Sequence, residues 1–214
     1  MTIQTVMVIG AGQMGSGIAQ VCAQAGFDVK LNDMKPEFFE RGLGVIAKNL
    51  SRDVEKGRKT EEEKQAILSR ITMSLTLQDA ADVDIVIEAA VENMDIKQSI
   101  FKQLDEIAPK HAILATNTSS LPITEIAAVT NRPQQVIGMH FMNPVPVMKL
   151  VEIIRGLATA DEVYKAVEEM TRKLDKTPVE VNDFPGFVSN RILLPMINEA
   201  IYTLYEGVAT KEAI

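Results

Sequence analysis

The sequence predicts an α/β protein with a doubly wound, mostly parallel sheet that is followed by helices. Short β-type runs alternate with longer helical runs through the first 152 residues, and the earliest β-type run ends in a glycine-rich turn that opens a helix. After about residue 186 the pattern becomes purely helical. Strands joined by helical crossovers form a parallel sheet that is covered on both faces, so these observations indicate a layered fold.

Residues 5–10 (TVMVIG) form the first predicted strand and lead directly into the first predicted helix. Gly26 suits the end of this helix, because glycine readily takes the left-handed backbone conformation that closes many helices. The apolar residues of the helix recur at the spacing of one helical face: Met14, Ile18, Val21, Cys22 and Ala25.

The other elements of the sheet region follow from the same two periodicities. Strands are predicted at residues 27–33, 71–75, 84–90, 112–116 and 135–140, and a further strand-like pattern surrounds Glu152. Helices are predicted at residues 35–52, 60–69 and 95–108, with a short one from Pro122. The basic turn EKGRK joins the helices at 35–52 and 60–69, so we expect a helical hairpin inserted between two strands.

The sequence changes character at VNDFPGF, residues 181–187. From Phe187 to Glu206 the apolar residues follow a helical pattern, and Gly207 suits the end of that helix. We therefore expect a sheet domain at residues 1–185. Residues 186–214 would begin an all-helical domain that is unfinished at the last residue.

The composition excludes several classes of protein. Of the 214 residues 46% are hydrophobic and 24% charged, as in an ordinary globular protein, and the net charge of −7 provides no general attraction to nucleic acid or an anionic membrane. The only cysteine, Cys22, cannot form an internal disulfide. No apolar stretch is long enough for a membrane span, and no signal peptide precedes residue 5. We expect a cytoplasmic protein without nucleic acid or membrane partners, and we assign no metal site.

The first chemical motif is VIGAGQMGSG, in which three glycines form a G-x-G-x-x-G pattern between a strand and a helix. Such glycines let the backbone turn tightly and approach a pyrophosphate at the helix N-terminus. Asp33 ends the next strand, where its carboxylate would bind the adenosine ribose and repel a 2′-phosphate. We predict a Rossmann-type NAD site, although FAD and S-adenosylmethionine proteins share parts of the pattern. Its predicted cofactor-binding residues are Gly10, Gly12, Gln13, Met14, Gly15 and Asp33.

The two histidines differ in their expected position. In an open parallel sheet, ligands gather outside the carboxyl ends of the strands. His140 ends the strand at 135–140, on the edge that holds the glycine loop, whereas His111 precedes a strand and lies at the opposite edge. His140 is therefore a candidate proton acceptor, and His111 is interpreted as a solvated loop residue.

The segment ATNTSSLP places polar side chains at the same edge as His140, because it follows the strand at 112–116. Asn117, Thr118, Ser119 and Ser120 suit either of two roles, capping the helix that begins near Pro122 or contacting a ligand. No G-x-S-x-G pattern surrounds the serines, so a hydrolase nucleophile is not expected. A serine that hydrogen-bonds a substrate oxygen fits better.

Five segments in order resemble the L-3-hydroxyacyl-CoA dehydrogenase family, most closely its short-chain 3-hydroxybutyryl-CoA members. The segments are VIGAGQMGSGIAQ, VIEAAVEN, NTSSL, GMHFMNPVPVMKLVEII and DFPGFVSNRIL. The resemblance implies an active site made of Ser119, His140, Glu152 and Asn190. It also implies that Glu92, Lys97 and Asn117 lie near the cofactor.

The resemblance further implies a reaction. His140 would act as the general base that takes the proton of the substrate 3-hydroxyl while hydride passes to NAD, and Glu152 would orient the imidazole. Ser119 and Asn190 would bind the substrate. The coenzyme A moiety would lie across the basic hairpin KNLSRDVEKGRK, where Lys56 best matches a basic ligand position. Such an enzyme serves fatty acid and butanoate metabolism as a homodimer formed through the C-terminal helical region.

Two other functions stay open at this point. One is a non-catalytic, crystallin-like NAD-binding relative, against which the complete set of site residues argues. The other is a dehydrogenase of a free hydroxy acid, for which the basic hairpin would have no task. Because Asn190 lies in the unfinished helical region, we expect this chain alone to bind NADH in the micromolar range with little turnover.

Overall fold

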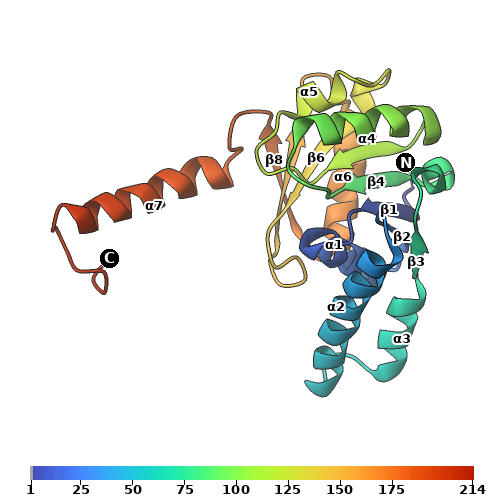
Figure 1. Cartoon of the computed structure of the whole chain (residues 1–214), viewed down its shortest axis with the longest axis horizontal. Coiled ribbons are helices and arrows are strands. Elements are labelled where there is room, and N and C mark those ends of the chain that lie inside the picture. The colour runs from blue at the N-terminus through green and yellow to red at the C-terminus, as the bar shows by residue number, and fades with distance from the viewer. Residues whose placement is uncertain (1) are drawn as a thin grey trace.

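The strands form one eight-stranded sheet in the order β3-β2-β1-β4-β5-β6-β7-β8 within residues 2–214, the part of the chain that this computed structural model describes (Figure 1). All neighbouring strands pair in parallel except β6 and β7, which are antiparallel. The chain leaves β1 toward β2 on one side and returns to β4 on the other. This reversal creates a switch point at the carboxyl ends of β1 and β4.

The predicted strands and helices are confirmed to within a few residues. The strands are β1 Thr5–Ile9, β2 Asp28–Asn32, β3 Ile71–Ser74, β4 Ile85–Glu88, β5 Ile113–Thr116, β6 Val136–Phe141, β7 Leu150–Arg155 and β8 Thr177–Asn182. The α-helices are α1 Gln13–Gln24, α2 Pro36–Glu55, α3 Glu61–Ser69, α4 Met94–Ile107, α5 Ile123–Ala127, α6 Asp161–Lys173 and α7 Ser189–Tyr205. Two 3₁₀-helices complete the described chain, η1 Leu77–Asp82 and η2 Pro133–Gln135.

Helix α6 and strand β8 are additions that the sequence patterns above do not assign. The apolar residues of α6 do follow a helical period, and they are buried against the sheet: Val163, Ala166, Val167 and Met170. Strand β8 is harder to detect, since most of its residues are exposed and it contains Pro178. Proline is tolerated there because β8 is an edge strand, where one row of amide groups needs no partner.

The core lies on both faces of the sheet. Within β1, Val6 and Val8 join the apolar cluster under α1, α2 and α6, whereas Met7 and Ile9 join the cluster under α4 and α5. Successive residues of a strand point to opposite faces, so a strand buried on both sides is apolar at every position. The sheet region thus has its own core on either face.

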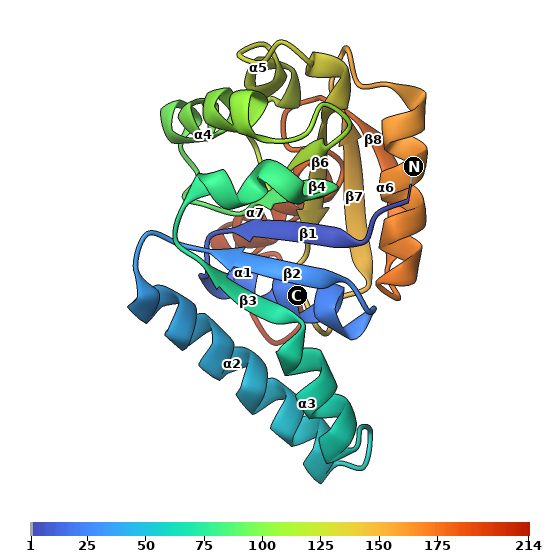
Figure 2. The same cartoon turned by 90° about the vertical axis from the view of Figure 1, so that its right-hand side faces the viewer.

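Helices α2 and α3 form the predicted hairpin, which extends past the edge of the sheet (Figure 2). A reciprocal cap begins α3. The Thr60 side chain accepts a hydrogen bond from the Glu63 amide at 3.2 Å, and the Glu63 carboxylate accepts one from the Thr60 amide at 2.8 Å. These bonds satisfy amides that a helix start otherwise leaves unpaired, so the hairpin has a defined turn.

Helix α7 projects away from the sheet, and it contains no buried residue (Figure 1). Gly207 follows its end with a positive φ of 73°, as predicted for a helix-closing glycine. No helix within residues 2–214 combines the length and the apolar character that a membrane crossing requires. The apolar side chains exposed on α7 include Ile192, Leu193, Leu194, Met196, Ile197 and Ile201.

Candidate active site

The glycine loop lies at the switch point between β1 and β4. Gly10 has a φ of 98°, and a Cβ there would lie 2.6 Å from the Ala89 carbonyl oxygen of the neighbouring strand end. A Cβ on Gly15 would lie 1.7 Å from the Gly10 carbonyl oxygen. Both positions therefore require glycine, because the first turn of α1 packs directly on the strand end.

The ligand-facing part of the same loop is open. A Cβ on Gly12 would meet no atom within 4 Å, and α1 begins at this residue without a side-chain cap. Uncapped amides at a helix N-terminus attract anions, so the loop suits the pyrophosphate of a dinucleotide. Gln13 extends from the loop and donates a hydrogen bond to the Asn143 side chain at 3.0 Å. Met14 is half-buried beside it.

Asp33 lies against the glycine loop, just after β2. Its carboxylate accepts hydrogen bonds from the amides of Ala11 at 2.8 Å and Met34 at 2.7 Å. These contacts fix the carboxylate beside the loop and leave it partly exposed. The residues present therefore fit an adenosine ribose next to a pyrophosphate, as the sequence motif predicts.

His140 and Glu152 face each other across the antiparallel strands β6 and β7, in directly paired register. The His140 Nδ1 lies 2.7 Å from the Glu152 Oε2, and the two side chains are 7% and 1% exposed. Since Nδ1 is engaged, Nε2 is the nitrogen left to exchange a proton with a ligand.

The second carboxylate oxygen of Glu152 is also occupied. It accepts hydrogen bonds from the amides of Val188 at 3.0 Å and Ser189 at 2.8 Å, where α7 begins. Desolvation raises the pKa of Glu152, but the hydrogen bonds from His140 and the two amides outweigh it and hold the pKa below its ordinary value. The carboxylate is therefore ionised at neutral pH.

Phe187 covers His140, with their ring centroids 5.8 Å apart and the planes tilted by 58°. Its side chain is buried, and its φ of 51° is unusual for a residue other than glycine. The sequence analysis treated Phe187 only as the start of a helical pattern. The available signal was its place in DFPGF, where an aromatic residue follows a proline–glycine turn.

Ser119 lies in the loop between β5 and α5, and two other segments hold its backbone. Its amide donates to the Glu92 Oε1 at 3.0 Å, and its carbonyl oxygen accepts a hydrogen bond from the Asn190 Nδ2 at 3.2 Å. The structure thus brings Ser119 and Asn190 together, with Asn190 extending from the first turn of α7. His140 and Glu152 lie on the neighbouring strands of the same sheet.

The choice between capping and ligand contact for this loop has a structural answer. The first amides of α5, at Ile123 and Thr124, donate to the Asp183 carboxylate at 3.1 and 2.8 Å. Asp183 is therefore the cap, although it lies about sixty residues away in sequence, at the end of β8. Ser119 is not needed to cap this helix and is half-exposed.

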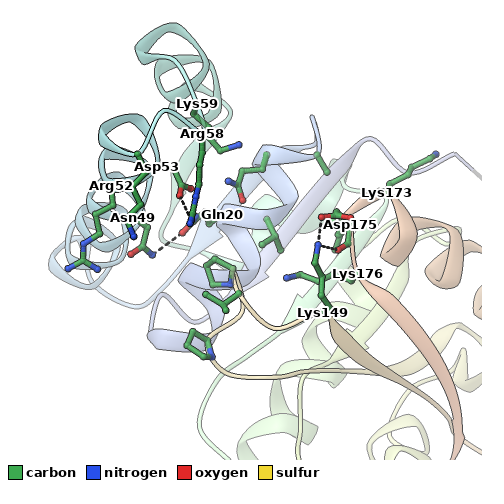
Figure 3. A pocket seen from close by; sticks show the side chains of 18 residues that line it. Gln20, Asn49, Arg52, Asp53, Arg58, Lys59, Lys149, Lys173, Asp175 and Lys176 are labelled. Atoms are coloured by element: carbon green, nitrogen blue, oxygen red, sulfur yellow. Dashed lines mark hydrogen bonds and ion pairs between the residues drawn. The ribbon is translucent and has the colours of Figure 1, made fainter.

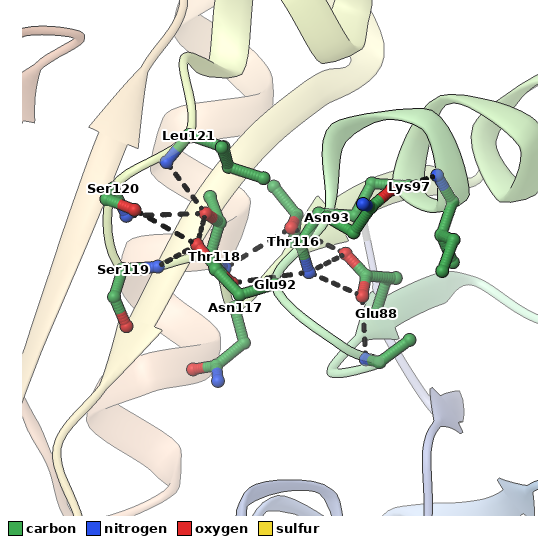
Figure 4. A network of polar contacts seen from close by, with 12 residues as sticks. Glu88, Glu92, Asn93, Lys97, Thr116, Asn117, Thr118, Ser119, Ser120 and Leu121 are labelled. Atoms are coloured by element: carbon green, nitrogen blue, oxygen red, sulfur yellow. Dashed lines mark hydrogen bonds and ion pairs between the residues drawn. The ribbon is translucent and has the colours of Figure 1, made fainter.

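Asn117 connects the ends of β5 and β6. Its side-chain oxygen accepts a hydrogen bond from the Phe141 amide at 3.0 Å, beside His140. Lys97 lies deeper, only 1% exposed, and its ammonium group donates to both oxygens of Glu88 at 2.7 and 2.9 Å. The ammonium is thus directed into the protein, with Glu92 3.7 Å away on the outer side. Figure 4 shows this network.

His111 lies at the other end of the sheet, as predicted. It occupies the loop before β5, its side chain is 59% exposed, and its Nε2 lies 3.5 Å from the Asp84 carboxylate. It shares no contact with the glycine loop or His140.

A separate open cleft of about 830 Å³ lies between the hairpin and the turn before β8 (Figure 3). Lys56, exposed at the end of α2, lines it together with Arg52 from one turn earlier. Arg58 pairs with Asp53 at 3.5 Å across the hairpin turn. Positive residues outnumber the two aspartates in the lining: Arg52, Lys56, Arg58, Lys59, Lys149, Lys173 and Lys176, against Asp53 and Asp175. The cleft therefore suits an anionic ligand even though the whole chain is acidic.

Comparisons with known proteins agree with this geometry. Residues 5–184 match the family model described as 3-hydroxyacyl-CoA dehydrogenase, NAD binding domain, and residues 186–214 match the model of the C-terminal domain. A probable 3-hydroxybutyryl-CoA dehydrogenase of Bacillus subtilis is 65% identical over 214 residues, which are 100% of this chain and 75% of that protein. A 3-hydroxybutyryl-CoA dehydrogenase of Bradyrhizobium diazoefficiens is 55% identical over 99% of this chain and 72% of its own length. The crystal structure of (S)-3-hydroxybutyryl-CoA dehydrogenase from Ralstonia eutropha superposes with a TM-score of 0.97 at 50% identity, covering 100% of this chain and 75% of that one.

Proposed function

The chain belongs to the 3-hydroxyacyl-CoA dehydrogenase family of NAD-binding oxidoreductases, and from this premise we propose that it interconverts (S)-3-hydroxybutyryl-CoA and acetoacetyl-CoA. The observation that carries the proposal is the His140–Glu152 pair, held at 2.7 Å at the same sheet edge as the glycine loop. A buried imidazole with one nitrogen fixed by a carboxylate is suited to act as a general base.

The proposed mechanism assigns one task to each side chain. His140 Nε2 takes the proton of the substrate 3-hydroxyl, and Glu152 stabilises the imidazolium that forms. The Ser119 hydroxyl donates a hydrogen bond to the oxygen at C3, and Asn190 holds the substrate from the side of α7. NAD held by the glycine loop and Asp33 would supply the acceptor for the hydride that leaves C3. The alcohol thus loses one proton and one hydride, and the product is the 3-oxoacyl thioester.

We assign the cofactor to the loop of Gly10, Gly12 and Gly15, with Gln13 and Met14 beside it and Asp33 on the ribose. Asn117 and Glu92 line the nicotinamide side in this proposal. Lys97 contributes indirectly, because its buried ammonium group contacts Glu88 and Glu92. The uncapped helix start and the bare Gly12 support this assignment.

The basic cleft is the proposed site for the nucleotide end of coenzyme A. Lys56 is exposed, and positive residues of two separate segments line the cleft. Phosphate groups carry the charge that such a lining attracts. A free hydroxy acid would leave the cleft without a role.

We also propose a division into a cofactor domain at 1–185 and a helical domain from 186, with homodimers forming through the helical region in the cytoplasm. The support is the exposed apolar surface of α7, since such a surface is usually covered by another chain or domain. Multi-angle light scattering tests the association. A clean monomer, with α7 still exposing these side chains, would contradict it.

The function is tested by following NADH consumption with acetoacetyl-CoA, and with acetoacetate as the control substrate. The chain is assayed alone and with the C-terminal residues of the Bacillus subtilis relative appended, because the match covers 75% of that protein. We expect both proteins to bind NADH and the extended chain to turn over acetoacetyl-CoA far better than acetoacetate. Equal rates with the free acid would favour a hydroxy-acid dehydrogenase, and NADH binding without turnover in either would favour a non-catalytic relative.

A further inference from the structure

Glu88 lies in the segment VIEAAVEN, but neither the sequence patterns nor the proposed mechanism gives it a role. It is the last residue of β4, is fully buried, and pairs in register with Ile9 of β1 on one side and Thr116 of β5 on the other. β1 leads into the glycine loop, and β5 leads into the segment with Ser119. Glu88 therefore lies between the two parts of the proposed site, at their base.

The Glu88 carboxylate binds three different segments. One oxygen accepts hydrogen bonds from the Ala90 amide and the Lys97 ammonium, both at 2.7 Å. The other accepts from the Lys97 ammonium at 2.9 Å and the Thr116 hydroxyl at 2.7 Å. Ala90 follows the end of β4, which lies against Gly10. Thr116 is the last residue of β5, and Ser119 lies in the loop that follows this strand. One carboxylate thus joins the end of β4 to α4 and to β5 (Figure 4).

A second carboxylate extends this network to the serine itself. Glu92, 3.7 Å from the Lys97 ammonium, accepts hydrogen bonds from the Thr118 hydroxyl and from the Ser119 amide. The Lys97 ammonium therefore lies between two carboxylates, those of Glu88 and Glu92, at the two ends of the segment 88–92. Lys97 and Thr116 are both buried, whereas Glu92, which contacts the Ser119 amide, is 40% exposed.

Stability alone does not account for this arrangement. Removing two charges from water costs more than a buried pair usually returns, and apolar residues of similar volume are often as stable in its place. The charged network instead fixes geometry, since each hydrogen bond holds its donor group at a defined position. Glu88 and Lys97 hold the two ligand loops, whereas similarly buried apolar residues would only fill the space.

We propose that Glu88 is a positioning residue, which sets Ser119 and the cofactor loop at the separation that hydride transfer needs. The inference rests on the proposed function, because it takes Ser119 as the substrate contact. Glu88 acts through Thr116 toward the serine and through the Ala90 amide toward the glycine loop. The two connections can be broken one at a time.

The first test is Thr116→Val, which removes the hydrogen bond between Glu88 and the Thr116 hydroxyl and leaves the bonds of Glu88 to Lys97 and the Ala90 amide in place. We expect turnover of acetoacetyl-CoA by the extended chain to fall roughly ten- to hundredfold, as small displacements of a reacting group do. NADH affinity, measured by fluorescence titration, should stay at the wild-type value. Thr116→Ser, which restores the hydroxyl, should recover the rate. Wild-type turnover in Thr116→Val would overturn the proposal.

The matched control is Thr171→Val. Thr171 is equally buried and donates its hydroxyl to the Val167 carbonyl oxygen at 2.7 Å, inside α6 and away from the site. We expect it to lower the melting temperature as Thr116→Val does, without a change in turnover. If each variant loses turnover in proportion to the decrease in its melting temperature, the role of Thr116 is structural and the inference is wrong.

The second test breaks both connections. Glu88→Leu should lower turnover further and also weaken NADH binding, because no side-chain acceptor is left for the Ala90 amide or the Thr116 hydroxyl. If this variant fails to fold with Lys97 left unpaired, the double variant Glu88→Leu/Lys97→Met removes both charges. We expect it to fold and to keep the low turnover, and wild-type rates from it would refute the inference.

Failure of the proposed function gives a different result. If the wild-type chain binds NADH but has no turnover in either form, the enzyme assignment fails while the positioning can still be measured. The amide resonance of Ser119 in a ¹⁵N-labelled chain should then shift in Thr116→Val and stay in place in Thr171→Val. An unmoved Ser119 resonance in both variants would refute the positioning role by itself.

Discussion

The two histidines of this chain lie at opposite ends of the sheet, each beside a carboxylate with the same kinds of partner. Glu152 accepts hydrogen bonds from the Val188 and Ser189 amides and contacts His140 at 2.7 Å. Asp84 accepts hydrogen bonds from the Gln4 and Thr5 amides and lies 3.5 Å from His111. Both carboxylates are therefore held as anions by two amides and an imidazole.

The difference lies in burial and location. The side chain of His140 is 7% exposed and that of His111 is 59% exposed, so water screens only the second pair effectively. His140 also stands at the strand ends where the glycine loop and Ser119 converge. A histidine–carboxylate contact by itself does not indicate a catalytic base. The features that favour such a role for His140 are its position at the ligand edge and its exclusion from water.

The largest expected effect comes from the histidines themselves. His140→Ala should lower turnover of the extended chain by roughly two to four orders of magnitude, the usual range for loss of a general base. NADH binding should persist, because the glycine loop and Asp33 are untouched. His111→Ala should leave the rate unchanged. Comparable losses in steady-state assays of both variants would mean that the assignment of the two sheet ends is reversed.

The carboxylates should differ next. In Glu152→Gln, the side-chain oxygen can still accept hydrogen bonds from the backbone amides at the start of α7. The NH2 group of the glutamine then faces His140. Its N–H would donate to Nδ1 and place the imidazole proton on Nε2, the nitrogen that must be free. We expect turnover to fall by about two orders of magnitude, since the wrong tautomer is a strong defect in comparable catalytic groups.

Asp84→Asn is the counterpart of that change at the other pair and should leave kcat unchanged. A pH–rate profile separates the two variants. Equal kcat values for Glu152→Gln and the wild type would remove Glu152 from the proposed mechanism.

Asp33 is a third carboxylate that accepts hydrogen bonds from two backbone amides. It lies at the ligand edge and has no histidine partner among the described residues. Asp33→Asn keeps the hydrogen-bonding shape but loses the charge. NADH affinity should fall about tenfold, in the range for a hydrogen bond to a charged group, while discrimination against NADPH relaxes. Titration calorimetry with both cofactors measures this. Unchanged affinities would exclude Asp33 from the ribose site.

The smallest expected effect concerns stability at the Asp84 end. Desolvation raises the pKa of Asp84, but the Thr5 and Gln4 amides and then His111 lower it below its ordinary value. A carboxylate with a depressed pKa contributes stability above its unfolded value, near pH 4, and loses that contribution as the pH falls through the folded value. Asp84→Asn should therefore lower the melting temperature at pH 7 by about one to three degrees, since its partner His111 is mostly exposed and water screens the pair.

The same comparison of melting temperatures at low pH checks the sign. As the pH falls through the folded pKa of Asp84, the melting temperatures of the wild type and Asp84→Asn should converge, because the carboxylate then loses its charge in the folded state as well. A difference that grows as the pH falls would contradict the assignment. Turnover at pH 7 should be the same in both proteins.

Local patterns were sufficient for much of the sheet and for the glycine loop. The requirement for Gly10, the place of Asp33 after β2 and the edge on which His140 lies all depend on short spacings between a strand and the next residues. Such spacings are visible in the sequence. The pairing of His140 with Glu152 is almost as easy to predict from the sequence, since only a short connection joins β6 and β7.

The contacts that sequence patterns missed join distant segments. Asp183 caps α5 from the end of β8, and Phe187 covers His140 from the start of α7. Glu88 looks like one more residue of a strand until Lys97 and Thr116 are seen on its two oxygens. None of these pairs has a fixed spacing, because tertiary packing rather than local geometry brings them together.

Glu152 joins two processes that are usually described separately, the movement of a proton and the placement of a helix. The same carboxylate holds His140 with one oxygen and the first amides of α7 with the other. Positive charge on the imidazole favours the anion, and the anion binds the amides. One group thus holds both the imidazole and the start of α7, and a displacement of either changes the carboxylate that orients the other.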